Sequence, residues 1–305
     1  MPDSIDIRTL SSLKSVDPRA WNDLSGEDDP FVEHAFLSLL EESGSVGRGS
    51  GWEPSHVTAW RGKKLVGALP LYLKTHSYGE YIFDWGWADA ASRIGIGYYP
   101  KLVAMVPVTP VTGRRFLFAP GEDPVPLVSR ILDGCFEVAD DARTSSLHLL
   151  FLSPEERDWV AQDGRLMSRL SFQFHWQNEG YATFEDFVGE FRSSMRKKVR
   201  KERRVASEAG LEIHKLQGDQ ISPEEWRSLE HLYRATCGRK GSYPYLTPEF
   251  FEMAPTMLDG TPLVFAARDR GRTVAASLNF AKGRHLYGRY WGATKRHDML
   301  HFELC

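Results

Sequence analysis

Titratable side chains gather in one short stretch of the sequence, between residues 76 and 89. The stretch contains His76, Tyr78, Glu80, Asp84 and Asp89. A carboxylate or an imidazole within hydrogen-bond reach of a reacting group can act as a general base, so these residue types indicate proton-transfer chemistry. If the stretch is a β-strand, Glu80 and Asp84 lie on the same face, because side chains alternate along a strand. We therefore expect both carboxylates to point into one solvated cleft.

Asp84 is the preferred candidate for the base, and Asp89 is the second. Asp84 stands between Phe83 and Trp85, and burial beside aromatic rings raises the pKa of a carboxyl group. The alternative is that both aspartates are turn or capping residues that follow a strand. His76 is a further candidate, because an unperturbed imidazole titrates near neutral pH.

The same stretch belongs to an internal repeat. Residues 61–81 and 270–290 align without a gap at an offset of 209 positions. The identical pairs are Arg61/Arg270, Gly62/Gly271, Leu69/Leu278, His76/His285, Tyr78/Tyr287, Gly79/Gly288 and Tyr81/Tyr290. Short apolar runs around Arg-Gly turns predict a three-stranded antiparallel meander in each copy. Because the histidine and the tyrosine recur together, the alternative for His76 is a structural His/Tyr pair at a hairpin corner.

A repeat of this length indicates a duplicated domain, and a chain of 305 residues is long enough for about two domains. We expect one domain over residues 1–180 and a second over residues 181–305. The order of strands, helices and meander predicts an α+β fold with mixed, mostly antiparallel sheets. Few residues follow the second meander, so the second domain is expected to be C-terminally truncated, with an exposed pairing edge that promotes association.

Further elements follow from local patterns. We expect an edge strand over 4–10, helices opening at Asp17-Pro18 and at Pro30, and a third meander strand over 78–87. Beyond the meander we expect a short helix over 99–106, a strand over 112–118, a helix over 124–143, a buried strand over 146–152 and an alternating strand over 171–177.

The composition is that of an ordinary soluble protein. Hydrophobic residues make up 42% and charged residues 26% of the chain, and no apolar run reaches the length of a membrane span. The sequence shows no export signal, and its three cysteines are far apart and in no metal-binding spacing. We therefore expect a cytoplasmic protein with no metal, no disulfide and no transmembrane segment.

Basic residues are concentrated in the helix predicted over residues 183–204. Thr183 and Asp186 form a capping-box pattern, and one apolar stripe runs along the helix. The opposite face is strongly basic, and Arg196, Lys197 and Arg200 are the candidates for binding phosphate groups. Two alternatives remain: a solvated charged face, or a helix that lies on an anionic membrane surface. The formal net charge of −3 gives the whole chain no basic footprint.

Several segments carry a resemblance to a known family. They are residues 34–47 (HAFLSLLEESGSVG), 70–90 (PLYLKTHSYGEYIFDWGWADA), 98–113 (YYPKLVAMVPVTPVTG), 192–204 (RSSMRKKVRKERR) and the ending HFELC. In these segments the chain resembles the bacterial family of predicted N-acyltransferases related to Fem-type peptidoglycan bridge-forming enzymes. The resemblance implies two tandem GNAT-like domains, which are the acyl-CoA N-acyltransferase type of fold.

The resemblance also implies a reaction. An amine on a small molecule or a cell-envelope precursor attacks an activated carbonyl, which aminoacyl-tRNA or acyl-CoA supplies as a co-substrate, with no tightly bound cofactor. The residues expected to contact substrate are Tyr78, Tyr98, Tyr99, Lys101 and Arg289, although residues 98–101 equally fit a helix face.

The choice of donor depends on phosphate recognition. The turn at residues 93–97 is one residue short of the Q/R-x-x-G-x-G/A pattern that binds the pyrophosphate of coenzyme A, which weighs against an acyl-CoA donor. The basic helix fits the phosphates of an aminoacyl-tRNA. The alternative function is a non-catalytic binding protein that recognises nucleic acid or cell-wall fragments on a duplicated fold.

Overall fold

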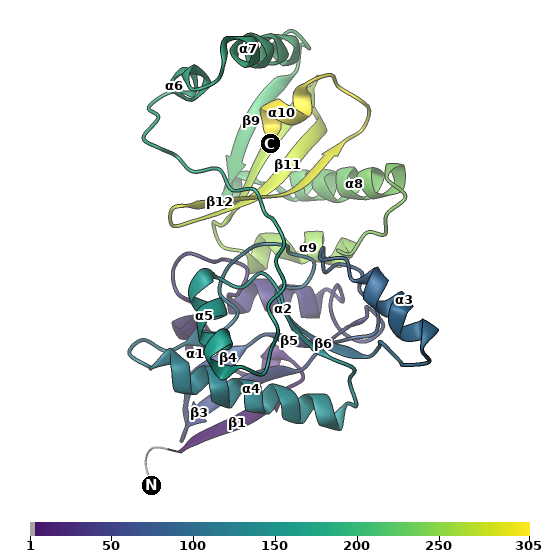
Figure 1. The fold of residues 1–305 in the computed structure, drawn as a ribbon. Coiled ribbons are helices and arrows are strands. Elements are labelled where there is room, and N and C mark those ends of the chain that lie inside the picture. The colour runs from purple at the N-terminus through teal and green to yellow at the C-terminus, as the bar shows by residue number, and fades with distance from the viewer. Residues whose placement is uncertain (1–3) are drawn as a thin grey trace. The chain divides into compact units, whose positions relative to one another are not determined.

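The computed structural model describes residues 4–305, which divide into two compact units (Figure 1). The first unit consists of the chain up to Arg169 together with Tyr245–Thr261 and Ala281–Tyr287. The second consists of Leu170–Pro244, Pro262–Phe280 and Gly288–Cys305. The expected division at residue 180 stays a prediction.

Two small sheets form the first unit. One has the order β1-β3-β4-β7 and is antiparallel, and the other has the order β2-β5-β6-β8, in which β6 and β8 run parallel. The strands are β1 (Ile5–Leu10), β2 (Trp52–Pro54), β3 (His56–Arg61), β4 (Lys64–Leu69), β5 (Leu71–Lys74), β6 (Lys101–Ala104), β7 (Leu117–Phe118) and β8 (Leu147–Leu149). The predicted α+β class with mixed, mostly antiparallel sheets is confirmed, and β1 is an edge strand as expected.

Pro70 separates the two sheets. It stands between β4 and β5, which pair with different partners, because proline has no N–H to donate to a continuous ladder. In the second copy of the repeat Asn279 occupies the equivalent position, and β11 (Arg272–Lys282) runs through it unbroken. One proline therefore makes the two copies of the meander differ.

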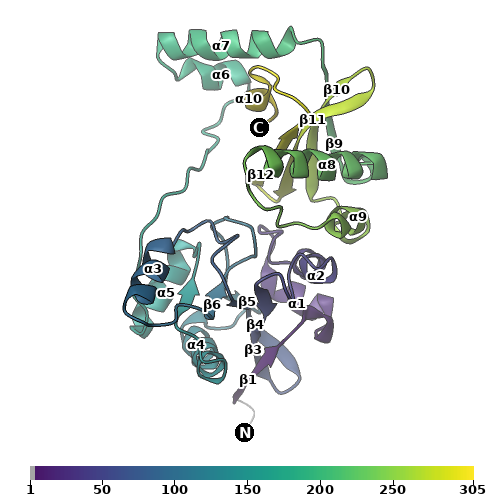
Figure 2. The same cartoon turned by 90° about the vertical axis from the view of Figure 1, so that its right-hand side faces the viewer.

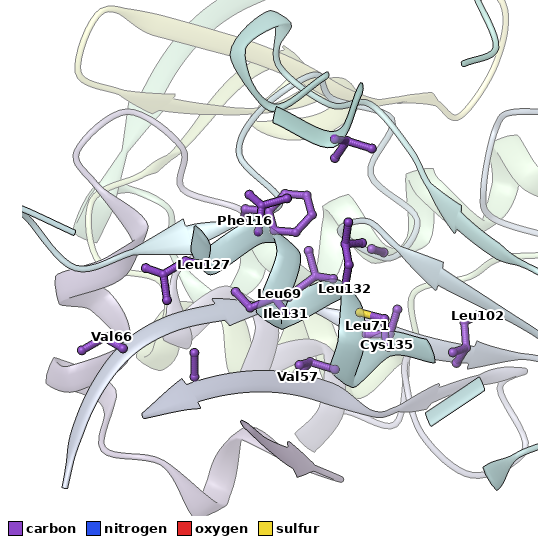
Figure 3. Close-up of a cluster of buried hydrophobic side chains, with 14 residues drawn as sticks. Val57, Val66, Leu69, Leu71, Leu102, Phe116, Leu127, Ile131, Leu132 and Cys135 are labelled. Carbon is purple, nitrogen blue, oxygen red and sulfur yellow. The ribbon is translucent and has the colours of Figure 1, made fainter. Parts of the chain in front are cut away.

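Helices cover the sheets of the first unit. They are α1 (Pro18–Ser25), α2 (His34–Glu42), α3 (Trp85–Arg93), α4 (Pro124–Asp141), α5 (Pro154–Asp163) and α9 (Pro248–Met257), with a 3-10 turn at Leu13–Ser15. Helix α4 packs on β1 and β3, as Figure 1 shows. Its buried face, which includes Ile131, Leu132 and Cys135, meets side chains of β3, β4 and β5 in the core of Figure 3. The helix expected from Pro30 begins instead at His34.

Four strand and helix predictions for residues 78–177 were wrong. Residues 78–87 form a turn and the start of α3, because β2 and β6 already occupy both edges of β5. The helix expected over 99–106 is strand β6, since a short buried apolar run fits either structure by periodicity. The strand over 112–118 is reduced to β7. Residues 171–177 alternate but pair with no strand of the described chain, and Phe172 and Phe174 are exposed.

The second unit contains the second meander. Its sheet has the order β12-β11-β10-β9, with β9 (Glu212–Gln217), β10 (Pro262–Asp269) and β12 (His285–Ala293), so the meander predicted there is confirmed. The helices are α6 (Phe184–Gly189), α7 (Ser193–Ser207), α8 (Pro223–Arg239) and α10 (Leu300–Leu304), with a 3-10 turn at Gly218–Gln220. The predicted single basic helix is thus two helices, and Figure 2 shows α7 beside α6 and α10. Thr183 and Asp186 do form the capping box of α6.

Within residues 4–305, no helix has both the length and the apolar character needed to cross a membrane.

Gly134 has no side chain, which allows α4 to approach β1 and β3 closely. A side chain at this position should therefore lower the free energy of unfolding. A Cβ atom on Gly134 would lie 2.5 Å from Ile7 Cγ2 and 3.0 Å from Val57 Cγ1. We expect Gly134→Ala to lower the free energy of unfolding by about 1–3 kcal/mol, although alanine favours a helix. The control is Gly86→Ala in α3, which meets no atom within 4 Å and should not lower stability. Urea unfolding of both variants measures the difference, and equal stability would contradict the packing argument.

Candidate functional site

Two buried lysines face each other in the second sheet of the first unit. Lys74 on β5 and Lys101 on β6 are directly paired in the antiparallel register, and each side chain is 0% exposed. Lysine is almost never fully buried unless it is paired. Glu80 and Asp84 are also buried, and they complete what we call the lysine–carboxylate cluster: Lys74, Lys101, Glu80 and Asp84.

Lys101 holds the cluster together. Its Nζ donates to Glu80 Oε2 and to Ser77 Oγ, both at 2.8 Å, and also to Asp84 Oδ2. The hydroxyl of Tyr98 donates to the same Asp84 oxygen at 2.6 Å. The sequence prediction that Glu80 and Asp84 lie together is therefore met, but in a buried ion-pair network and not in a solvated cleft. They meet because the turn before α3 folds onto Lys101, and not because they alternate along a strand.

Tyr99 supports the same network from its other side. Its hydroxyl lies 2.8 Å from Ser77 Oγ, which also accepts from Lys101. Tyr98, Tyr99 and Lys101, all expected to contact substrate, are thus brought together with Glu80 and Asp84. Tyr98 and Lys101 hold the carboxylates through hydrogen bonds, and Tyr99 contacts Ser77.

The two carboxylates differ in their electrostatics. Burial raises the pKa of Glu80, and the nearby charge of Lys101 offsets only part of that effect. Burial also acts on Asp84, but hydrogen bonds from Lys101, Ser77 and Tyr98 outweigh it and leave the pKa of Asp84 lowered. The raised pKa expected for Asp84 was therefore wrong, because the sequence does not show that Lys101 and Tyr98 reach it.

Each carboxylate keeps one oxygen without a partner. Glu80 Oε1 and Asp84 Oδ1 are buried, and no donor within residues 4–305 reaches them. The indole Nε1 of Trp52 is likewise buried without an acceptor in the described chain. An unsatisfied buried polar atom costs about 1–3 kcal/mol, so a water molecule or a ligand is expected to supply the missing hydrogen bonds. The two oxygens can accept hydrogen bonds from a ligand that carries N–H groups.

Lys74 has a different environment from Lys101. Its Nζ donates to the backbone carbonyl of Tyr78 at 3.2 Å and lies 3.6 Å from the ring centroid of Trp52. In the part of the chain that the structure describes, it forms no ion pair. Burial lowers the pKa of Lys74 to about 7, since the attraction of Glu80 and Asp84 compensates only in part and Lys101 repels the charged form.

The other candidates of the 76–89 stretch lie outside the cluster. The ring of His76 packs edge-on against Tyr78 at 5.3 Å, and burial followed by the charge of Lys74 lowers its pKa. His285 and Tyr287 are also in ring contact, at 5.9 Å, which fits the structural His/Tyr pair. Asp89 is exposed on α3 and pairs with Arg93 at 2.5 Å. The backbone of Tyr78 contacts the cluster, but its side chain is exposed.

The candidate binding residues of the second unit differ in the contacts that they form. Arg196 donates to the carbonyl of Gly189 at 2.9 Å, and Arg200 donates to Glu185 at 2.7 Å. Lys197 is exposed, and no ion pair of this lysine is found in residues 4–305. The guanidinium of Arg289 lies 4.9 Å from the ring centroid of Tyr290.

Sequence reasoning missed three residues of this site, namely Lys74, Ser77 and His148. His148 on β8 lies 2.8 Å from Ser146 Oγ and beside Tyr98, and burial, with the charge of Lys101, lowers its pKa to about 4. A signal for Lys74 existed: alternation along residues 71–74 places it on the same face as Tyr72, which is buried. No group of three or more potential metal-ligating side chains occurs in residues 4–305.

Comparisons with known proteins bear on the family. Residues 12–305 match the model of the FemAB-like family, which is described as peptidoglycan biosynthesis/recognition. A search of curated proteins finds no match. Among solved structures, FemX is similar at 10% identity and a TM-score of 0.49, covering 95% of this chain and 81% of FemX. A ribosomal-protein-alanine N-acetyltransferase from Brucella melitensis biovar Abortus 2308 is similar at 14% identity and a TM-score of 0.33, covering 57% of this chain and 99% of that one.

The burial of Lys74 predicts a pH-dependent change in stability. A lysine whose pKa is lower in the folded state binds its proton more tightly when unfolded, so stability rises as the pH rises from about 7 toward 10.5. At pH 6 the folded protein must bury a charged lysine, which lowers its stability, and methionine carries no charge to bury. Lys74→Met should therefore raise the free energy of unfolding by about 1–3 kcal/mol more at pH 6 than at pH 9. The exposed Lys64→Met is the control and should change stability equally at both pH values. Urea unfolding at the two pH values measures the change, and an effect of Lys74→Met that is the same at pH 6 and pH 9 would contradict the prediction.

Proposed function

Because the chain belongs to the FemAB-like family of peptidoglycan biosynthesis and recognition, we propose that it transfers an aminoacyl or acyl group to an amine of a peptidoglycan precursor. The observation that carries this proposal is the lysine–carboxylate cluster, in which two buried carboxylate oxygens lack a donor. Acyl transfer to an amine needs a site that binds the amine, and this cluster has the chemistry to do so.

The acceptor enters this site as an ammonium group. An aliphatic amine is protonated at neutral pH and presents N–H donors with no acceptor. Glu80 Oε1 and Asp84 Oδ1 offer two acceptors, while Lys101 fixes the other oxygen of each carboxylate. Charge-assisted hydrogen bonds of this kind are about twice as strong as neutral ones. In this proposal Glu80 and Asp84 bind and orient the amine, and Asp84, with its lowered pKa, is not the base.

The turn that carries the carboxylates covers the site. Glu80 and Asp84 are 1% and 3% exposed, so the acceptor reaches them only when the turn at residues 75–84 moves. Gly79 and Tyr81 both have positive φ angles, of 81° and 59°, and Tyr81 and Phe83 expose their rings to solvent. In this proposal the part of the turn with positive φ angles and exposed rings opens, and the ion pairs of Lys101 with Glu80 and Asp84 close the turn again once the acceptor is bound.

For the donor, we propose aminoacyl-tRNA, bound through α7. Among the basic side chains of this helix, Lys197 and Lys201 are exposed and have no ion pair in the described chain, whereas Arg200 and Arg203 pair with Glu185 and Glu303. Lys197 and Lys201 are four residues apart and therefore lie on one face of the helix. Two free lysines on one face suit contacts with successive phosphates.

A transfer assay tests the acceptor site. Wild-type protein is incubated with peptidoglycan peptides that bear a free amine and with either aminoacyl-tRNA or acyl-CoA, and the acylated peptide is measured. We expect Asp84→Asn to lower kcat/KM by about 10- to 100-fold, the range for loss of a hydrogen bond to a charged group. Asp89→Asn is the matched control, since Asp89 pairs on the surface with Arg93, and should keep the wild-type rate. Peptide binding without transfer from either donor would instead support a non-catalytic binding protein.

Salt titration of tRNA binding tests the donor site. Each phosphate contact contributes about 0.7–0.9 to the slope of log affinity against log salt. The double variant Lys197→Glu with Lys201→Glu should therefore lower the slope by about 1.4–1.8 and weaken binding. The double variant Lys215→Glu with Lys240→Glu carries the same change of charge at exposed positions outside α7 and should bind as the wild type does. Equal weakening by both variants would contradict a site on α7.

A further inference from the structure

We infer that Lys74 is the general base that removes the proton from the acceptor's ammonium group. This inference rests on the proposed transfer to an amine and names the residue that makes the amine reactive. An ammonium group has no lone pair and cannot attack a carbonyl, so the reaction requires a base beside the site that binds it.

The position of Lys74 fits this role. It pairs directly with Lys101 across the strands β5 and β6, so the two side chains lie on the same face of the sheet, and the charges of Glu80 and Asp84 act on Lys74 as well. Lys101 donates to Glu80, Asp84 and Ser77, whereas within residues 4–305 Lys74 donates one hydrogen bond, to the carbonyl of Tyr78. A lysine without an ion pair is free to gain and lose its proton.

The charges around Lys74 come from β6 and from the turn at residues 75–84. Lys101 faces it from β6, Glu80 and Asp84 face it from the turn, and His76 lies close by on the same turn. On the side of β2 it meets the uncharged ring of Trp52. Burial is the largest influence on the pKa of Lys74 and favours the neutral amine. The charges of Glu80 and Asp84 act in the opposite direction and stabilise the protonated form in part. A pKa of about 7 makes Lys74 an effective base at neutral pH.

Other titratable groups near the cluster are less suitable. The pKa of Asp84 is lowered by its hydrogen bonds, so it accepts a proton poorly. The pKa of His148 is about 4, because burial and Lys101 disfavour its charged form. Glu80 has a raised pKa, but one of its oxygens is already bound to Lys101.

The step conserves charge inside the site. The acceptor's –NH3⁺ gives one proton to the neutral amine of Lys74, which becomes –NH3⁺, and the acceptor becomes –NH2. The lone pair of that nitrogen forms the new C–N bond with the activated carbonyl, and the bond from that carbon to the donor's oxygen or sulfur breaks. The leaving group takes up the second proton of the attacking nitrogen. One positive charge moves from acceptor to Lys74, so the carboxylates stabilise the site before and after the step.

Lys74→Arg tests the inference in the transfer assay. Arginine keeps the positive charge but cannot lose its proton, so we expect kcat to fall by about 100-fold or more while the KM for the acceptor changes little. In the wild type, kcat/KM should rise with pH and level off above about 7, and the variant should lose this dependence. Lys64→Arg on the exposed end of β4 is the control and should keep both rate and pH profile.

A second variant guards against a folding defect. Lys74→Ala leaves room for a small amine, and added ethylamine should restore part of the rate, with more basic amines restoring more.

An NMR titration measures the pKa of Lys74 directly. The lysines are labelled with ¹³C at Cε and ¹⁵N at Nζ, and the Lys74 signal is assigned by its loss in Lys74→Arg. We expect Lys74 to titrate near pH 7.

The outcomes separate this inference from the proposed function. If the wild type transfers no acyl group from either donor, the proposed function fails and the role of Lys74 fails with it. If the wild type is active but Lys74→Arg keeps its rate and pH profile, or if Lys74 titrates above pH 9, the proposed function stands and Lys74 is not the base.

Discussion

The ion pairs of Lys101 are the interaction on which the first unit's site depends. A buried ammonium group must be paired, and breaking a buried pair by removing one partner costs about 3–5 kcal/mol. Lys101 therefore draws Glu80 and Asp84 inward, and with them the turn that precedes α3. That single arrangement decides where α3 begins, leaves one oxygen of each carboxylate without a partner, and leaves Lys74 without a carboxylate of its own.

Pro70 explains why the site occurs in one copy of the repeat. Because the proline ends β4, β5 joins a second sheet and pairs with β2 and β6, so the segment after β5 is free to form the turn. In the other copy β11 passes through Asn279, and the equivalent segment becomes β12. Arg289 then stands at the position of Glu80, and Lys74 is replaced by Gly283. The two copies of the repeat thus fold differently, and the charged residues of the lysine–carboxylate cluster occur in the first copy.

In the basic helix α7, tertiary contacts decide which of the basic side chains are paired with carboxylates. By composition, α7 presents a nearly continuous basic face, yet Arg200 and Arg203 are neutralised by Glu185 and Glu303, which lie 15 and 100 residues away in the sequence. Exposed ion pairs contribute little to stability, but they do change which cations remain available to a ligand. Lys197 and Lys201 have no ion pair in the described chain, so the proposed phosphate-binding surface has fewer unpaired cations than the sequence indicates.

The sequence by itself determined the features that depend on local pattern: the internal repeat, the second meander, the α+β class, the family resemblance and the cap at Thr183. Helix caps, alternation and turns act over a few residues, so they can be read from the chain. Tertiary structure decided which edges of β5 were occupied, and so whether residues 78–87 became a strand or a turn. It also decided the pKa of each buried group, because burial and the nearest charge, and not the residue type, set whether Asp84 or Lys74 can accept a proton.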